Sequence, residues 1–130
     1  MKILIAEDEM ISRKFIYKFL SKFGDCDLTI DGGEAIDAFM MALDEVEPYD
    51  LVCLDIMMPN VDGLKALKII REIEVERGIS ESDKVKIIMT TALNDVTNVQ
   101  SAFETGSEGY AVKPINTQKL TDVMKRLKLI

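Results

Sequence analysis

Short apolar runs alternate along the chain with longer stretches in which apolar residues recur at helical spacing. The runs lie at 3–6, 26–30, 51–54, 85–90 and 110–112. Several of them are apolar at successive positions, which is typical of parallel strands that helices cover on both faces. Strands that alternate with helices five times over predict an α/β protein with a doubly wound, five-stranded parallel sheet.

The stretches between the runs have the periodicity of amphipathic helices. The first is marked by Ile11, Phe15, Phe19, Leu20 and Phe23, and we expect it to stop at Gly24. The others lie at 35–46, 64–73, 96–103 and 120–127, while the polar segment 76–84 is expected to be a loop. No linker or repeat interrupts this order, so we expect one domain over residues 1–130 and no output domain.

Composition narrows the classes of function. The net charge of −7, from 16 basic and 23 acidic residues, argues against direct binding of nucleic acid and favours cations. Histidine is absent, which excludes Ser–His–Asp and Cys–His catalysis and histidine-based zinc sites. Cys53 lies in an apolar run and is expected to be a core residue. No segment has the length of a membrane span or a signal-peptide core, so we expect a cytoplasmic protein with no membrane partner.

Polar side chains follow four of the predicted strands. Glu7 and Asp8 come after the first strand, and Asp55 ends the third. Thr91 comes after the fourth strand, and Lys113 after the fifth. In open α/β sheets ligands bind beyond the carboxyl ends of the strands, so we expect the three acids to converge there.

Three carboxylates held close together repel each other unless a cation neutralises them. Mg²⁺ fits such a site, because it takes one or two carboxylates and leaves room for a phosphate oxygen. Calcium is less suited, since the sequence contains no calcium-binding loop of the DxDxDG type. Each residue alone also has an ordinary explanation, because strands end at the surface and threonine is a common strand residue. Their placement at one edge of the sheet favours a site.

The segments around these residues resemble the receiver domain of two-component response regulators, such as the stand-alone chemotaxis regulators. The resemblance rests on five segments that span nearly the whole chain: ILIAEDE at 3–9, DGGEAI at 31–36, DLVCLDIMMPNVDG at 50–63, IIMTTA at 87–92 and GYAVKP at 109–114. It implies a flavodoxin-like (βα)5 fold with strand order 2-1-3-4-5.

The resemblance also implies how the acids act. Asp55 is expected to be the phosphoacceptor, a carboxylate that attacks a phosphoryl group and forms an acyl phosphate. Mg²⁺ is expected to bind Glu7, Asp8, Asp55 and the backbone carbonyl of Met57, with Asp8 bound directly and Glu7 chiefly through water. The phosphoryl group is expected to come from a partner sensor histidine kinase, a phosphotransfer protein or a small acyl phosphate.

Further residues are expected to bind and report the phosphoryl group. By resemblance, its oxygens contact Thr91, the backbone amide of Ala92 and Lys113, and the Lys113–Pro114 peptide bond is cis. Thr91 is then expected to move toward the phosphoryl group and let Tyr110 turn inward. This movement would reshape the face made by the helix at 96–103, the strand at 110–112 and the helix at 120–127, where a downstream protein binds.

The leading interpretation is therefore a single-domain response regulator, a signalling domain rather than an enzyme. A phosphorelay intermediate that passes the phosphoryl group on remains open. The full set of acids, threonine and lysine argues against a receiver-like domain used only for binding. An aspartate-nucleophile phosphatase of the haloacid dehalogenase type needs a second acid where this chain has Met57. A flavodoxin-like redox carrier needs a phosphate-binding loop where the chain has EDEMIS. The apolar residues Met57 and Leu93 predict a long-lived phosphoryl group.

Overall fold

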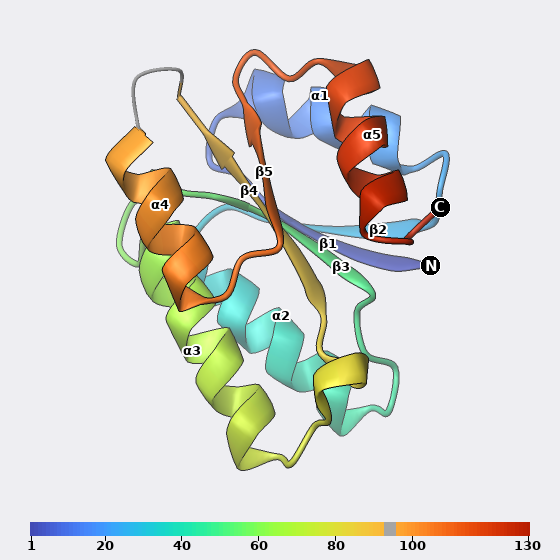
Figure 1. Ribbon diagram of the computed structural model, residues 1–130, viewed down its shortest axis with the longest axis vertical. Coiled ribbons are helices and arrows are strands. Elements are labelled where there is room, and N and C mark those ends of the chain that lie inside the picture. The colour runs from blue at the N-terminus through green and yellow to red at the C-terminus, as the bar shows by residue number, and fades with distance from the viewer. Residues whose placement is uncertain (93–95) are drawn as a thin grey trace.

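The computed structural model describes residues 1–92 and 96–130, in which strands and helices alternate (Figure 1). The elements are β1 (Lys2–Ala6), α1 (Met10–Leu20), β2 (Asp25–Thr29), α2 (Gly32–Asp44), β3 (Leu51–Asp55), α3 (Gly63–Glu76), β4 (Lys86–Thr91), α4 (Val96–Thr105), β5 (Gly109–Val112) and α5 (Thr117–Arg126). A short 3₁₀ helix, η1 (Glu81–Asp83), lies between α3 and β4. Leu93 falls outside the described residues.

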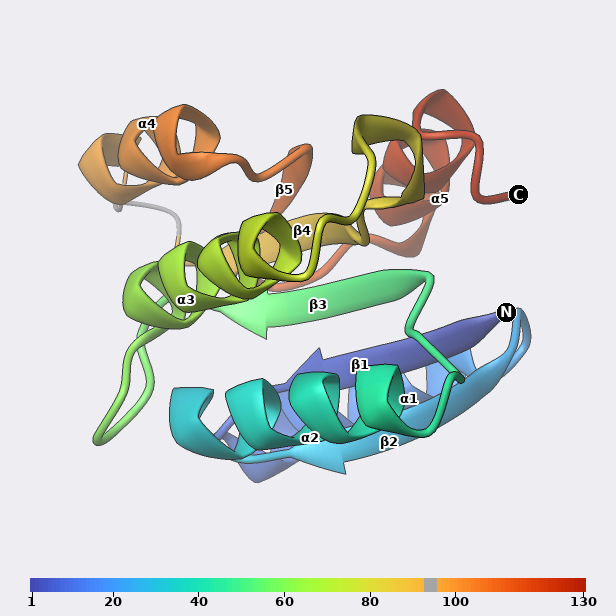
Figure 2. The same ribbon diagram turned by 90° about the horizontal axis from the view of Figure 1, so that it is seen from below.

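All strands of the sheet are parallel and lie in the order β2-β1-β3-β4-β5. This confirms the predicted fold class and strand order. Figure 2 shows the arrowheads of β1, β2 and β3 pointing to one edge of the sheet, while both chain ends lie at the opposite edge. The carboxyl ends of the strands therefore share one edge, as the site prediction requires.

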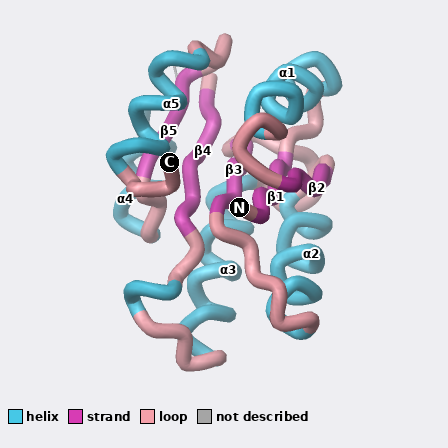
Figure 3. Tube along the Cα trace, turned by 90° about the vertical axis from the view of Figure 1, so that its right-hand side faces the viewer, coloured by secondary structure: helices cyan, strands magenta, loops and turns pink. Residues whose placement is uncertain are grey.

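Helices cover both faces of the sheet (Figures 1 and 3). One face packs against α1 and α5 through Ile16, Leu20, Leu120 and Met124. The other face packs against α2, α3 and α4 in a larger apolar cluster that includes Phe39, Leu67, Ile70 and Ala102. Within the described residues, no helix is both long and apolar enough to cross a membrane.

Side-chain caps explain where several helices begin. Asp31 accepts a hydrogen bond from the Glu34 N–H at the start of α2, and Asp62 accepts one from the Lys65 N–H at the start of α3. Asn116 accepts one from the Lys119 N–H at the start of α5. Such caps satisfy N–H groups that have no partner within the helix. The three helices therefore begin at defined residues just beyond the carboxyl ends of β2, β3 and β5.

Two local expectations were wrong. The predicted apolar side of α1 included Ile11 and Phe15, which are 74% and 45% exposed, whereas Ile16 and Leu20 are buried. A row of residues four apart turns by about 40° per step around a helix, so its first members leave the buried side. The segment 76–84 is not wholly a loop, because α3 continues through Glu76 and η1 follows.

Candidate functional site

The three predicted acids converge at the carboxyl edge of the central strands. Ala6 and Leu54 are register partners in β1 and β3, so Glu7 and Asp55 are neighbours one residue further on. Glu7 is fully buried, Asp55 is 3% exposed and Asp8 is exposed. One carboxylate oxygen from each of the three lies within 4.8 Å of the others. The parallel register therefore brings together acids that are far apart in the sequence.

The turn after β3 is held tightly against the strand end. The Ile56 N–H donates to the Thr90 carbonyl at 3.0 Å, and the Gly63 N–H donates to the Ile56 carbonyl at 2.8 Å. A side chain at Gly63 would place its Cβ 2.0 Å from the Asp55 carbonyl oxygen, so only glycine fits there. The Met57 N–H donates to Asp55 Oδ1 at 3.3 Å. These contacts fix the orientation of the Asp55 carboxylate.

Lys113 reaches the acids from the end of β5. Its backbone N–H donates to the Thr91 carbonyl at 2.7 Å, which holds the start of the turn against β4. Its Nζ lies 2.5 Å from Glu7 Oε1 and 3.1 Å from Asp55 Oδ2. The Lys113–Pro114 peptide bond is cis. One ammonium group is thus shared by two buried carboxylates.

The protonation of the site reflects this crowding of acids. Burial, together with the neighbouring Glu7, raises the pKa of Asp55 to about 7, although Lys113 opposes the shift. Burial on its own would lower the pKa of Lys113, but its contacts with Glu7 and Asp55 outweigh that effect and raise it. Burial and the neighbouring Glu7 carboxylate therefore make Asp55 easier to protonate than an ordinary aspartate.

The predicted switch residues lie on β4 and β5. Thr91 is buried at the end of β4, and its Oγ1 donates to the Ala92 carbonyl at 3.3 Å. Tyr110 is 43% exposed and packs edge to face against Phe103 of α4, with 5.7 Å between the ring centroids. The tyrosine ring is therefore on the outer surface in this structure. Leu93, part of the prediction about the lifetime of the phosphoryl group, lies outside the described residues.

Two residues near the acids have roles that the sequence did not assign. Arg13 donates from Nη1 to the carbonyl oxygens of Glu7 and Asp8, at 3.0 and 3.1 Å, and so holds the acidic turn. Glu9 accepts hydrogen bonds from the N–H groups of Ser12 and Ile11, which lower its pKa and make it the cap of α1. The third acid of the EDE segment therefore starts a helix. Its position just before a helical stretch was the available signal.

The donor set suits a hard divalent cation. Mg²⁺ prefers carboxylate and carbonyl oxygens and retains several waters, and the three carboxylates supply one oxygen each. Glu7 Oε1 is buried and lies 2.5 Å from the Lys113 ammonium nitrogen, so the two groups form a close ion pair. A cation bound here would share this oxygen with Lys113 or take its place. Histidine and cysteine ligands are absent from this cluster, which makes a zinc site unsuitable.

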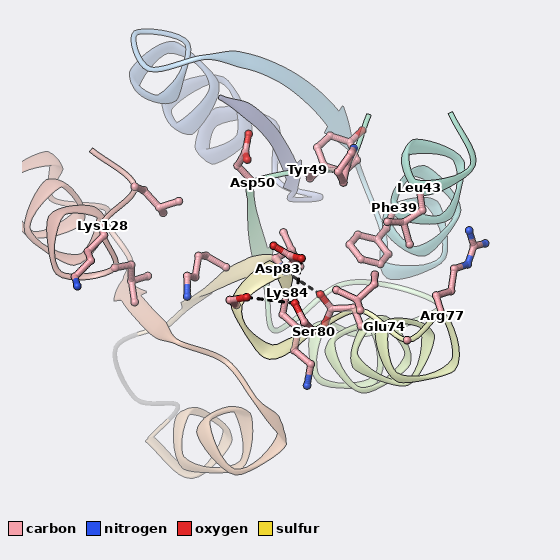
Figure 4. Close-up of a pocket in the computed structure, with 18 residues that line it drawn as sticks. Phe39, Leu43, Tyr49, Asp50, Glu74, Arg77, Ser80, Asp83, Lys84 and Lys128 are labelled. Carbon is pink, nitrogen blue, oxygen red and sulfur yellow. Dashed lines mark hydrogen bonds between the residues drawn. The ribbon is translucent and has the colours of Figure 1, made fainter. Parts of the chain in front are cut away.

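A separate pocket of about 640 Å³ lies at the opposite edge of the sheet, between α2, α3, η1 and the chain after α5 (Figure 4). Its wall includes the segment 77–84, to which the sequence assigned no role. Glu74 projects from α3 toward this pocket, but its oxygens are already hydrogen bonded to Arg71 and to the Val85 N–H. The Glu74 carboxylate at this pocket is therefore already paired within the protein.

Comparison with known proteins assigns the family. The profile of the family described as "Response regulator receiver domain" matches residues 3–125. The chain belongs to this family, and it is a receiver domain of two-component signalling. Receiver domains bind Mg²⁺ at an acidic site, which agrees with the cluster of Glu7, Asp8 and Asp55.

Curated relatives extend beyond the receiver domain. A "Hybrid signal transduction histidine kinase I" from Dictyostelium discoideum is 35% identical over 124 residues, which cover 95% of this chain and 7% of the relative. A "Probable transcriptional regulator ycf27" from Galdieria sulphuraria is 40% identical over 120 residues, covering 92% of this chain and 42% of the relative. The chain therefore spans less than half the length of these relatives.

Solved structures share the fold. The receiver domain of the response regulator Ssk1 in the Saccharomyces cerevisiae complex with the histidine phosphotransfer protein Ypd1 is 25% identical, with a TM-score of 0.81 and coverage of 100% of this chain and 92% of that chain. The Borrelia burgdorferi complex of CheX, CheY, BeF3 and Mg²⁺ gives 25% identity, a TM-score of 0.80 and coverage of 98% and 88%.

Proposed function

We propose that this receiver domain accepts a phosphoryl group on Asp55 and thereby changes a surface that a partner protein binds. One observation carries the proposal: Asp55 is held at a strand end beside two more carboxylates and one ammonium group. Acyl phosphate formation needs an ionised carboxylate and groups that offset the charge of the phosphoryl oxygens. Asp55 is ionised above its pKa of about 7, and the Lys113 ammonium group beside it can offset such charge.

Each residue has a distinct task in this proposal. Asp55 attacks phosphorus, and Lys113 exchanges its contact with the carboxylate for one with a phosphoryl oxygen. Thr91 and the Ala92 amide bind further oxygens. Glu7, Asp8, Asp55 and the Met57 carbonyl hold Mg²⁺, which neutralises negative charge on the transferring group when it is bound.

Among the acids, Asp55 is best placed to be the nucleophile. The Oε2 atom of Glu7 accepts a hydrogen bond from the Glu9 N–H at 3.1 Å, and its Oε1 atom lies against Lys113. Asp8 is exposed and makes no ion pair with Lys113. Asp55 combines a fixed orientation with direct contact to the ammonium group, so the incoming charge is offset where it arrives.

The added charge is proposed to act through Thr91 and Tyr110. A phosphoryl group adds about −1.5 to −2 charge at neutral pH for the familiar phosphoesters. Movement of Thr91 toward it would free space near β5, and the Tyr110 ring would leave Phe103 and turn inward. The surface of α4, β5 and α5 would then present a different shape to a downstream protein. Retention of full phosphorylation-dependent partner binding by Thr91→Ala would disprove this switch.

A phosphotransfer protein or a sensor histidine kinase is the proposed phosphoryl donor. The Ssk1 receiver domain was solved with the phosphotransfer protein Ypd1, and one curated relative is a hybrid histidine kinase. Met10, Ile11 and Phe15 of α1 are 54%, 74% and 45% exposed next to the acidic turn. Apolar side chains beside a phosphoryl site provide contact area for such a donor.

Intact-mass measurement tests the central proposal. The parent chain treated with acetyl phosphate and Mg²⁺ is expected to gain one phosphoryl mass, and Asp55→Asn is expected to gain none. Asp37→Asn is the matched control, because Asp37 is an exposed acid on α2, and it should behave like the parent. An unmodified parent, or an equal gain in Asp55→Asn, would contradict the proposal.

A further inference from the structure

Thr90 carries a buried hydroxyl that no part of the proposed reaction uses. The residue is 3% exposed in β4, and its Oγ1 has no hydrogen-bond partner among the described residues. Buried polar atoms are almost always hydrogen bonded, and an exception calls for an explanation. Valine has nearly the same shape and suits a strand equally well, so packing alone does not account for a threonine here.

The position of Thr90 relates it directly to the phosphoacceptor. Asp55 and Thr90 are register partners in β3 and β4, and neighbouring strands lie about 4.8 Å apart. Cys53 and Ile88 belong to the cluster that faces α1 and α5. Side chains two residues apart share a face of a sheet, so Asp55 and Thr90 lie on that same face. The unpartnered hydroxyl therefore belongs to the row of side chains that contains the phosphoacceptor.

The position of Lys113 explains why the Thr90 hydroxyl makes no hydrogen bond to Asp55 in the unphosphorylated protein. Thr90 pairs with Ala111 of β5, and Lys113 follows two residues later on the same face. From β5, its Nζ crosses the level of β4 and reaches Asp55 Oδ2 at 3.1 Å. Lys113 therefore pairs with Asp55 Oδ2, an oxygen that the Thr90 hydroxyl could otherwise reach.

We propose that Thr90 is a second hydroxyl of the phosphoryl site, which donates a hydrogen bond to the Asp55 carboxyl group once Lys113 has moved to the phosphoryl oxygens. This inference rests on the proposed phosphorylation of Asp55. When Lys113 leaves, the carboxyl group loses a donor. The described residues contain one buried hydroxyl without a partner beside it, and that hydroxyl is Thr90 Oγ1.

The hydrogen bond would speed loss of the phosphoryl group. In hydrolysis a water oxygen forms a bond to phosphorus, and the bond between phosphorus and the Asp55 oxygen breaks. Its electron pair stays on the carboxylate; one water proton remains on the phosphate and the other goes to solvent. Negative charge grows on the carboxylate as the bond breaks, so a donor there stabilises the transition state more than the acyl phosphate.

The test compares Thr90→Val, which removes the hydroxyl, with Thr90→Ser, which keeps it. The full chains are phosphorylated with acetyl phosphate and Mg²⁺, the donor is removed, and the remaining adduct is followed by intact mass. We expect Thr90→Val to lose the phosphoryl group about tenfold more slowly than the parent, which corresponds to about 1.4 kcal/mol in the barrier. Thr90→Ser is expected to keep the parent rate.

Stability provides a second readout, which checks that the Thr90 hydroxyl has no partner in the unphosphorylated protein. Thr90→Val is expected to raise the denaturant midpoint, because it removes a buried polar atom without a partner. Thr29 is the matched control: its buried Oγ1 donates to the Ile5 carbonyl at 3.0 Å. Thr29→Val should lower the midpoint and leave the phosphoryl lifetime unchanged.

Other results would overturn either this inference or the proposed phosphorylation of Asp55. An unchanged lifetime in Thr90→Val overturns the inference, and so does an equally slow Thr90→Ser, since the effect would then come from packing. Failure of Thr90→Val to take up any phosphoryl group also overturns it, because the proposed bond acts during loss. A parent chain that takes up no phosphoryl group would instead refute the proposed function.

Discussion

Two clusters of charged side chains lie at opposite edges of the same sheet. At the carboxyl edge, Glu7, Asp8 and Asp55 are accompanied by the ammonium group of Lys113. At the amino edge, a second cluster joins Arg71 of α3 to Glu74 and Glu108. Both contain buried carboxylates, and both connect segments that are distant in the sequence.

The clusters differ in how many donors and positive charges face their carboxylates. We call the Arg71 cluster matched and the cluster of Glu7, Asp8 and Asp55 unmatched. The Arg71 guanidinium donates to both carboxylates and to the carbonyl oxygens of Val85 and Gly106. Glu74 accepts the Val85 N–H at 2.8 Å, and Glu108 accepts the Ile87 N–H at 3.0 Å. At the other edge, one ammonium group, that of Lys113, is shared by Glu7 and Asp55.

This difference separates a structural cluster from a functional one. The Arg71 network holds α3 against the starts of β4 and β5, and its charged groups are hydrogen bonded to one another and to the backbone. A cluster with surplus negative charge costs stability in the unliganded protein, and it persists where a cation or an incoming group relieves it. Burial raises the pKa of Asp55 and Glu7 adds to the shift, whereas burial alone raises the pKa of Glu108 and Arg71 opposes it.

The largest expected effect comes from breaking the matched cluster. Arg71→Ala should lower the free energy of unfolding by about 3–5 kcal/mol, because Glu74 would remain buried without its partner. Urea denaturation measures the loss. Arg77→Ala is the matched control, since Arg77 pairs with Asp44 across a partly exposed surface and should change stability by less than about 1 kcal/mol. Equal losses in the two variants would show that the Arg71 network has no special role.

Removing a charge from the unmatched cluster should have the opposite sign. At pH 8 without Mg²⁺, Asp55→Asn should raise the free energy of unfolding by roughly 2 kcal/mol, because it ends the burial of one charge and its repulsion with Glu7. The same denaturation measurement applies, with Asp37→Asn as the exposed control. A destabilised Asp55→Asn would mean that Lys113 already compensates the acids.

The stability difference between Asp55→Asn and the parent should depend on pH. The pKa of Asp55 is raised from 3.8 to about 7 in the folded chain, so between these values the folded state holds a proton that the unfolded state has released. The parent therefore loses stability as pH rises toward 7, on the order of 1 kcal/mol per pH unit. Measured from pH 4 to 8, the advantage of Asp55→Asn should grow and then level off. A constant advantage would contradict the shifted pKa.

The smallest expected effect is stabilisation by Mg²⁺. A free concentration ten times the dissociation constant should add about 1.4 kcal/mol to the free energy of unfolding, by mass action on the folded state. Thermal unfolding at fixed ionic strength measures this shift in the parent, and Asp8→Asn should reduce it. Glu108→Gln, in the matched cluster, should keep the full response to Mg²⁺. A response that survives in Asp8→Asn would place the ion elsewhere.

Much of the site could be predicted because its residues come directly after apolar runs. Glu7, Asp55 and Lys113 each end or follow a strand, and parallel strands deliver such residues to one edge. The Arg71 network could not be predicted, since nothing in the local pattern around Glu74 or Glu108 shows that one guanidinium joins them. The lack of a partner for the Thr90 hydroxyl could not be predicted either, because threonine is a common residue in strands.

The sequence by itself determined the alternation of strands and helices and the position of each acid relative to a strand end, because these follow from local periodicity and chain order. Only the tertiary structure decided which charges are matched, which side of α1 is buried and which hydroxyl has no partner. Those properties depend on distances between segments that are remote in the chain. A hydrogen bond or an ion pair forms within a few tenths of an ångström, and a sequence pattern carries no information at that precision.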